Sequence, residues 1–200
     1  MNSWIFVLPW IGSLLVAPVL ALAGHGFITT FGNIEWLPEP GRTPDSAWYQ
    51  IDTWQEEGQL LITRAPEEKI RLCLTFAREK LAELAAMVTS ENPHAAEIAA
   101  DRYQFYIDRA RHILDHDLAE KEPMAEVMAN ALLEHQYILS VIYEELPTET
   151  RAIVPHVIAM GQEQYAQVSG LLSPKKKGAL FFKEEEVRWS VQMATRAESQ

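Results

Sequence analysis

The sequence has little of several features that define common protein classes. Its 200 residues contain a single cysteine, Cys73, so the chain forms no internal disulfide and carries no zinc ribbon or Cys-x-x-Cys-His haem site. Cys73 is expected to be a small buried apolar residue, and an intermolecular bridge is the alternative. Lys and Arg number 17 against 28 Asp and Glu, giving a net charge of −11. This balance argues against a nucleic-acid-binding protein, because such proteins need clustered basic residues.

Motifs of the common enzyme classes are also missing. The chain has no Gly-Lys-Ser/Thr phosphate loop, no Gly-x-Gly-x-x-Gly fingerprint and no Gly-x-Ser-x-Gly nucleophile turn. The hydrophobic pattern directs no acid–base pair inward. We therefore expect neither an enzyme nor a bound cofactor.

Alternating runs rich in Val, Ile and Thr are absent too, as is an Asn-Gly hairpin turn, so no strands are expected. Apolar residues recur at helical spacing instead. The clearest stripe predicts a helix that begins at Pro66 and buries Ile70, Leu74, Ala77, Leu81, Leu84 and Val88. Other helices are predicted to start at Pro44, after Asn92-Pro93 (ending near Glu120), at Pro123 and after Pro147-Thr148-Glu149. Because the connections are short, the sequence predicts an all-α antiparallel bundle of about four long helices, preceded by a short helix.

The first 23 residues carry no charged side chain, and the run from Trp4 to Ala23 is almost wholly apolar. It ends in Ala21-Leu22-Ala23 before Gly24, and small residues at these positions suit signal-peptidase cleavage. Export and removal of 1–23 are expected, and a retained membrane anchor is the alternative because about 20 apolar residues can span a bilayer. Membrane contact is expected only through this segment, if it stays uncleaved.

The remaining chain divides into three predicted parts. Residues 24–44, rich in Gly, Pro and Thr, form an irregular lead-in. Residues 45–172 form the helical bundle domain. In 173–200, a linker over 173–178 precedes a short C-terminal helix or tail, with Phe181, Phe182 and Trp189 as its docking side chains. Trp48, Ile51 and Trp54 or Gln55 share one side of the short first helix, and Tyr and Trp residues at helical spacing are expected in the core.

Three segments carry a resemblance to a known family. They are Pro44-Asp45-Ser46-Ala47-Trp48-Tyr49, Trp54-Gln55-Glu56-Glu57 and Pro66-Glu67-Glu68-Lys69, and a second match covers 134–165. The chain resembles a bacterial and archaeal family of exported helical domains of unknown function. Ala47 departs from the proline usual at that position. The resemblance implies an exported all-helical domain and brings no catalytic residues with it.

Three histidines are the candidate chemical groups. His112 and His116 lie one helical turn apart, a spacing that suits two imidazoles on one zinc ion. They lie off the apolar stripe through Ile113, so a solvated helix face is expected and a metal site is the alternative. His135 occupies a buried position and needs a hydrogen-bond partner, which a Tyr or carboxylate would supply; a pH-sensitive switch or a ligand role is the alternative.

The sequence thus favours a non-catalytic exported protein: a binding, scaffold or regulatory module of the periplasm or cell envelope with a protein partner. The alternative is a periplasmic metal-binding or metal-sensing bundle that uses His112 and His116.

Overall fold

A computed structural model describes Phe31 and residues 36–196 of the chain. This part is all-helical, as predicted, and no strand occurs within it. The helices are α1 (Tyr49–Ile62), α2 (Pro66–Thr89), α3 (Pro93–His116), α4 (Glu122–Ile142), the 3-10 helix η1 (Tyr143–Glu145), α5 (Ile153–Ser169) and α6 (Pro174–Arg196).

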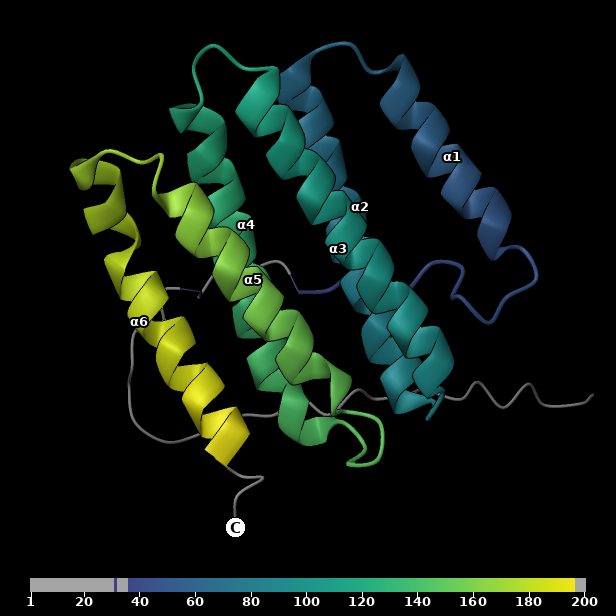
Figure 1. The fold of residues 1–200 in the computed structure, drawn as a ribbon. Helices are drawn as coiled ribbons and strands as arrows, with labels where there is room; N and C mark the ends of the chain where they lie inside the picture. Colours follow the sequence, from purple (N-terminus) through teal and green to yellow (C-terminus); the bar gives the residue numbers. More distant parts are fainter. Residues whose placement is uncertain (1–30, 32–35, 197–200) are drawn as a thin grey trace, which may run out of the picture.

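Helices α2 to α5 form an up-and-down bundle in which successive helices run antiparallel (Figure 1). α2 packs on α3 and α4 packs on α5, and contacts of α3 with α5 and of α2 with α4 close the ring. The two remaining helices flank this bundle: α1 lies against α2 at one edge and α6 lies against α4 at the opposite edge (Figure 1). The predicted antiparallel bundle with a short first helix is therefore confirmed, and α6 adds a long helix to it.

The turn between α2 and α3 shows how local sequence sets the helix ends. Asn92 N–H donates to the Met87 carbonyl at 2.9 Å and Glu91 N–H to the Val88 carbonyl at 3.1 Å. This paired pattern is a Schellman motif, which requires a left-handed residue, and Glu91 supplies it with a φ of 56°. Asn92 then caps α3 by accepting from Ala95 N–H, and Pro93 occupies the first turn, where no backbone donor is needed.

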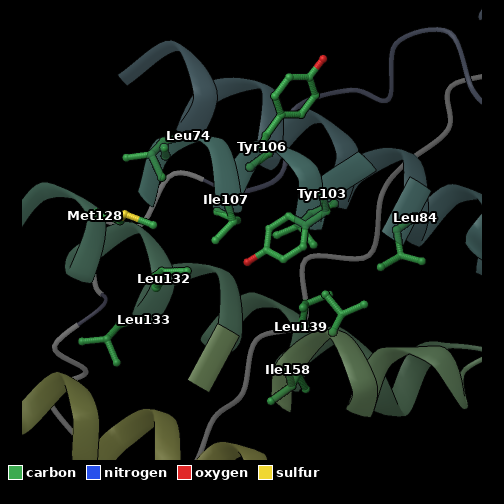
Figure 2. Packing of buried hydrophobic residues seen from close by; sticks show 14 of the residues in the cluster. Leu74, Leu84, Tyr103, Tyr106, Ile107, Met128, Leu132, Leu133, Leu139 and Ile158 are labelled. Carbon is green, nitrogen blue, oxygen red and sulfur yellow. The ribbon is translucent and has the colours of Figure 1, made fainter. Parts of the chain in front are cut away.

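The core lies between the four bundle helices. The predicted stripe of α2 is buried in full, and so are the apolar residues that face it from α3 and α4. In Figure 2 the Tyr103 ring points into the centre of the bundle, whereas the Tyr106 ring is directed away from it. Tyr106 therefore belongs to a second buried cluster, which lies on the side of α1.

Four predicted boundaries are wrong. α1 begins at Tyr49, because 43–48 form turns in which Ser46 N–H donates to the Thr43 carbonyl. α3 ends at His116 and not near Glu120. α5 begins at Ile153 and not directly after Glu149, because 148–152 form turns. Most of the expected linker over 173–178 belongs to α6, which begins at Pro174: proline suits the first turn, lysines are good helix formers, and Leu180, Val187 and Ala194 bury one side of the helix.

Candidate functional site

A group of charged residues lies buried between α1, α2 and α3. Lys80 of α2 is 0% exposed, and its Nζ lies 2.7 Å from Oε1 of Glu56 on α1 and 2.7 Å from Oε1 of Glu83 one turn further along α2. The Tyr49 ring of α1 covers the ammonium at 5.2 Å. We call Glu56, Lys80, Glu83 and Tyr106 the Lys80 cluster.

Helix α3 completes this cluster. The Tyr106 hydroxyl donates to Oε2 of Glu56 at 2.5 Å and accepts from Arg102 Nη2 at 3.2 Å. Arg102 also lies 3.5 Å from Glu57, the neighbour of Glu56 on α1. Two adjacent residues of α1 are thus tied to α3 while Glu56 is tied to α2, which fixes the rotation of α1 about its axis.

Electrostatics explain why the cluster stays together. Burial lowers the pKa of Lys80, but the contacts with Glu56 and Glu83 outweigh it and raise the pKa, so the ammonium stays protonated. Burial, opposed by Lys80, raises the pKa of Glu83 to about 7. A buried ion pair of this kind contributes little net stability but is costly to break, so it serves to specify one arrangement of helices.

The apolar pattern did not predict this cluster, and the expectation that no acid–base pair points inward is wrong. A signal was present: Cys73 lines up on α2 with Ala77 and Leu84 of the predicted stripe, at steps that place Lys80 among these apolar residues. A lysine inside an apolar stripe of a long helix predicts a buried partner carboxylate.

The orientation set by the Lys80 cluster turns the apolar side of α1 outward. The helix buries Tyr49, Glu56 and Leu60. Large exposed apolar side chains define the α1 outer face: Ile51, Trp54, Leu61 and Ile62 of the helix, and Trp48, which caps its start. Exposure reaches 68% for Trp54 and 79% for Ile62. The expectation that tryptophans lie in the core is therefore wrong for Trp48 and Trp54, whereas it holds for the tyrosines Tyr103 and Tyr106.

The centre and rim of the α1 outer face are also defined. Gly58 lies on this face between Trp54 and Ile62, and a Cβ built there would meet no atom within 4 Å. At the rim, Asp52 lies 4.0 Å from Arg42 and Glu57 lies 3.5 Å from Arg102. The face is thus apolar and open at its middle, with rim carboxylates that already have basic partners.

Helix α6, at the opposite edge of the molecule, also exposes large apolar side chains. Phe181, Phe182, Trp189 and Met193 of α6 are exposed, Phe182 by 69%. The expectation that Phe181, Phe182 and Trp189 dock the C-terminal helix is therefore wrong. Lys183 of α6 instead donates to Asn130 of α4 at 2.9 Å, and the helix packs through Leu180 and Val187. The aromatic residues fall on the other side of the helix from this apolar heptad stripe.

His112 and His116 lie side by side at the end of α3, with ring centroids 4.5 Å apart, and both are exposed. The nearby Asp115 accepts from Arg111 at 2.8 Å, and Asp108 accepts from Gln164 at 2.9 Å. Among the residues that the structure describes, no three His, Cys, Asp or Glu side chains gather as metal ligands. The pair offers at most two ligands from this helix.

His135 of α4 lies in the interior at 3% exposure, with Nδ1 3.4 Å from the Tyr103 hydroxyl. Burial, reinforced by the charge of Arg78, lowers its pKa to about 3, so the ring is neutral at physiological pH. It borders an open groove of about 510 Å³ between α2 and α4, lined also by Arg71, Glu126 and Glu134. The mixed charges of this groove favour no single ligand class.

Fold and surface together define a helical domain whose ionic cluster is enclosed and whose first helix presents an apolar side to solvent. Over residues 41–149 the chain matches the family described as a domain of unknown function (DUF5667). The chain belongs to this family, which confirms the predicted relationship to a family of helical domains of unknown function. Comparisons with curated proteins and with solved structures returned no match.

Proposed function

We propose that the protein is a non-catalytic binding or scaffold module of the cell envelope, and that the α1 outer face is its binding surface. The observation that carries the proposal is the inverted orientation of α1. Glu56 lies inside the protein, while Trp54 and Ile62 face solvent. A short helix normally buries its apolar side, so an opposite arrangement, held by ion pairs, favours a surface kept for a partner.

Two features support binding over catalysis. Lys80 is enclosed, and its neighbours Glu56 and Glu83 hold it in a closed ionic contact. Tryptophan and large aliphatic side chains, by contrast, are the kind of anchor that enters a partner's pocket, and they gather on the α1 outer face.

Export is part of the same proposal and rests on the uncharged apolar run of residues 1–23, which lies outside the described residues. Within the described part, no helix is both long and apolar enough to cross a membrane. Mass spectrometry of the protein isolated from its native cells should give an N-terminus at Gly24. A soluble cytoplasmic protein that retains Met1 would contradict export.

Binding is tested in the native cells with a photoreactive amino acid at position 54, in the full chain. We expect a defined adduct that an added Ile62→Glu substitution abolishes, since the charge interrupts the apolar face. The matched control carries the photoreactive group at Glu97, an exposed position of α3. Equal adduct formation at both positions, or none at position 54, would reject the α1 outer face as a binding surface.

Metal binding by His112 and His116 is the second candidate function. The observation in its favour is the adjacency of the two imidazole rings. Metal analysis of the purified protein tests it: one equivalent of zinc or copper that His112→Ala/His116→Ala removes would establish this role, and a metal-free protein would reject it.

A further inference from the structure

We infer that the partner of the α1 outer face is a second copy of this chain, bound through an antiparallel contact of two α1 helices with Gly58 at its centre. This inference rests on the proposed function, because it names the occupant of the same surface.

The first argument is that part of the face is symmetric about Gly58. Trp54 and Ile62 lie four residues on either side of it, on the same side of the helix, whereas the positions symmetric to Trp48 and Ile51 lie beyond the end of α1. In an antiparallel pair related by a twofold axis at Gly58, Trp54 of each copy lies opposite Ile62 of the other. Twofold interfaces need a patch that is complementary to itself in this way.

Space at the axis is the second argument. A Cβ at Gly58 would meet nothing within 4 Å, so the backbone is accessible there. A glycine at a helix crossing allows two backbones to approach closely, and the larger flanking side chains then pack around the crossing point. Trp54 and Ile62 are the flanking residues that would do so.

The third argument is that the exposed area suits a second copy. The five side chains of the α1 outer face expose on the order of 700 Å² together, which is close to the ~800 Å² that each partner contributes to an interface of standard size. Of these, Trp54, Leu61 and Ile62 would face the partner's α1, and Trp48 and Ile51 would reach the partner's residues beyond Ile62.

Charge is the fourth argument. The chain carries a net charge of −11, and α1 has no lysine or arginine, so an anionic lipid surface would repel this edge. A second copy meets little local repulsion, because Asp52 and Glu57 at the rim already face Arg42 and Arg102. An apolar and locally neutralised surface suits an equal partner better than a membrane.

Cysteine cross-linking in the native cells tests the inference with the full chain. Gly58→Cys places a thiol on the twofold axis, and oxidation of two such thiols by copper phenanthroline should give a disulfide-linked dimer on a non-reducing gel. The wild type is the background control: Cys73 is fully buried, and burial raises the pKa of its thiol to about 11, so it should stay unreacted.

Two matched variants make the test specific. Gly178→Cys lies on α6 and also faces open space, and it should give no dimer. Gln55→Cys lies on α1 beside the outer face and off the axis, so its two thiols are separated by about 9 Å along the helix and should not join.

Four results would overturn the inference: no dimer from Gly58→Cys, a dimer from Gly178→Cys instead, equal dimer from Gln55→Cys, or a disulfide only when Gly58→Cys and Gly178→Cys chains are expressed together. The photo-crosslinking experiment at position 54 distinguishes a failure of the second-copy inference from a failure of the proposed function. An adduct with a different protein or with lipid, lost on Ile62→Glu, would leave the binding surface standing and remove only the second copy as its occupant.

Discussion

Replacing Lys80 by methionine removes the positive charge of the Lys80 cluster while nearly conserving side-chain volume. The ammonium is the partner of Glu56 and Glu83, each at 2.7 Å, and Lys80 is 0% exposed. The variant therefore leaves two buried carboxylates beside each other without a cation between them. Breaking a buried pair in this way costs about 3–5 kcal/mol of the free energy of unfolding.

The sign of the pH dependence follows from Glu83. Its folded pKa is raised to about 7 from an ordinary 4.5, so its contribution to stability is present below pH 4.5 and is lost as the pH rises through 7. Without Lys80 the carboxylates take up protons more readily still. The loss caused by Lys80→Met should thus be larger at pH 8 than at pH 5.

Urea unfolding of the wild type and the variant at both pH values measures this loss. The matched control is Lys80→Met/Glu56→Gln/Glu83→Gln, which removes all three charges and keeps an acceptor for the Tyr106 hydroxyl. It should recover most of the free energy that Lys80→Met loses, because no buried charge remains unpaired. A Lys80→Met cost below about 1 kcal/mol at pH 8, or a triple variant no more stable than Lys80→Met, would refute the reasoning.

Three further substitutions test other parts of the structure. Glu91→Gly should raise the free energy of unfolding by about 1 kcal/mol, since glycine adopts the left-handed conformation without strain, and a decrease in denaturation experiments would contradict the Schellman turn. Leu81→Ala should lower it by about 2–5 kcal/mol, because Leu81 is fully buried, and an unchanged urea midpoint would reject that burial. His112→Ala/His116→Ala should leave the thermal midpoint nearly unchanged, with or without EDTA, and a chelator-dependent midpoint in the wild type would reveal a structural metal.

The bundle was predictable from the sequence because its helices carry apolar residues at regular helical spacing. In α2 every residue of the predicted stripe, from Ile70 to Val88, is buried, and proline marks the helix start within one residue. These signals are local and repeat along many turns, so a single irregularity does not hide them.

The edge helices were not predictable in the same way. The period of an amphipathic helix identifies its apolar side, but it does not say whether that side is buried. For α1 the orientation is decided by Glu56 meeting Lys80, two residues on different helices, and for α6 by the stripe through Leu180 and Val187. The large aromatic residues dominated the pattern on both helices, and on both they lie on the exposed side.

The central claim is that α1 keeps its apolar side for binding and is held in place by its polar side. The free energy of unfolding of Trp54→Gln/Ile62→Gln, measured by urea denaturation of dilute protein, tests it most directly. Both side chains are largely exposed, so the value should stay within about 0.5 kcal/mol of the wild type. A loss of several kcal/mol would show that these residues belong to the folded core, and would contradict an outward-facing binding surface on α1.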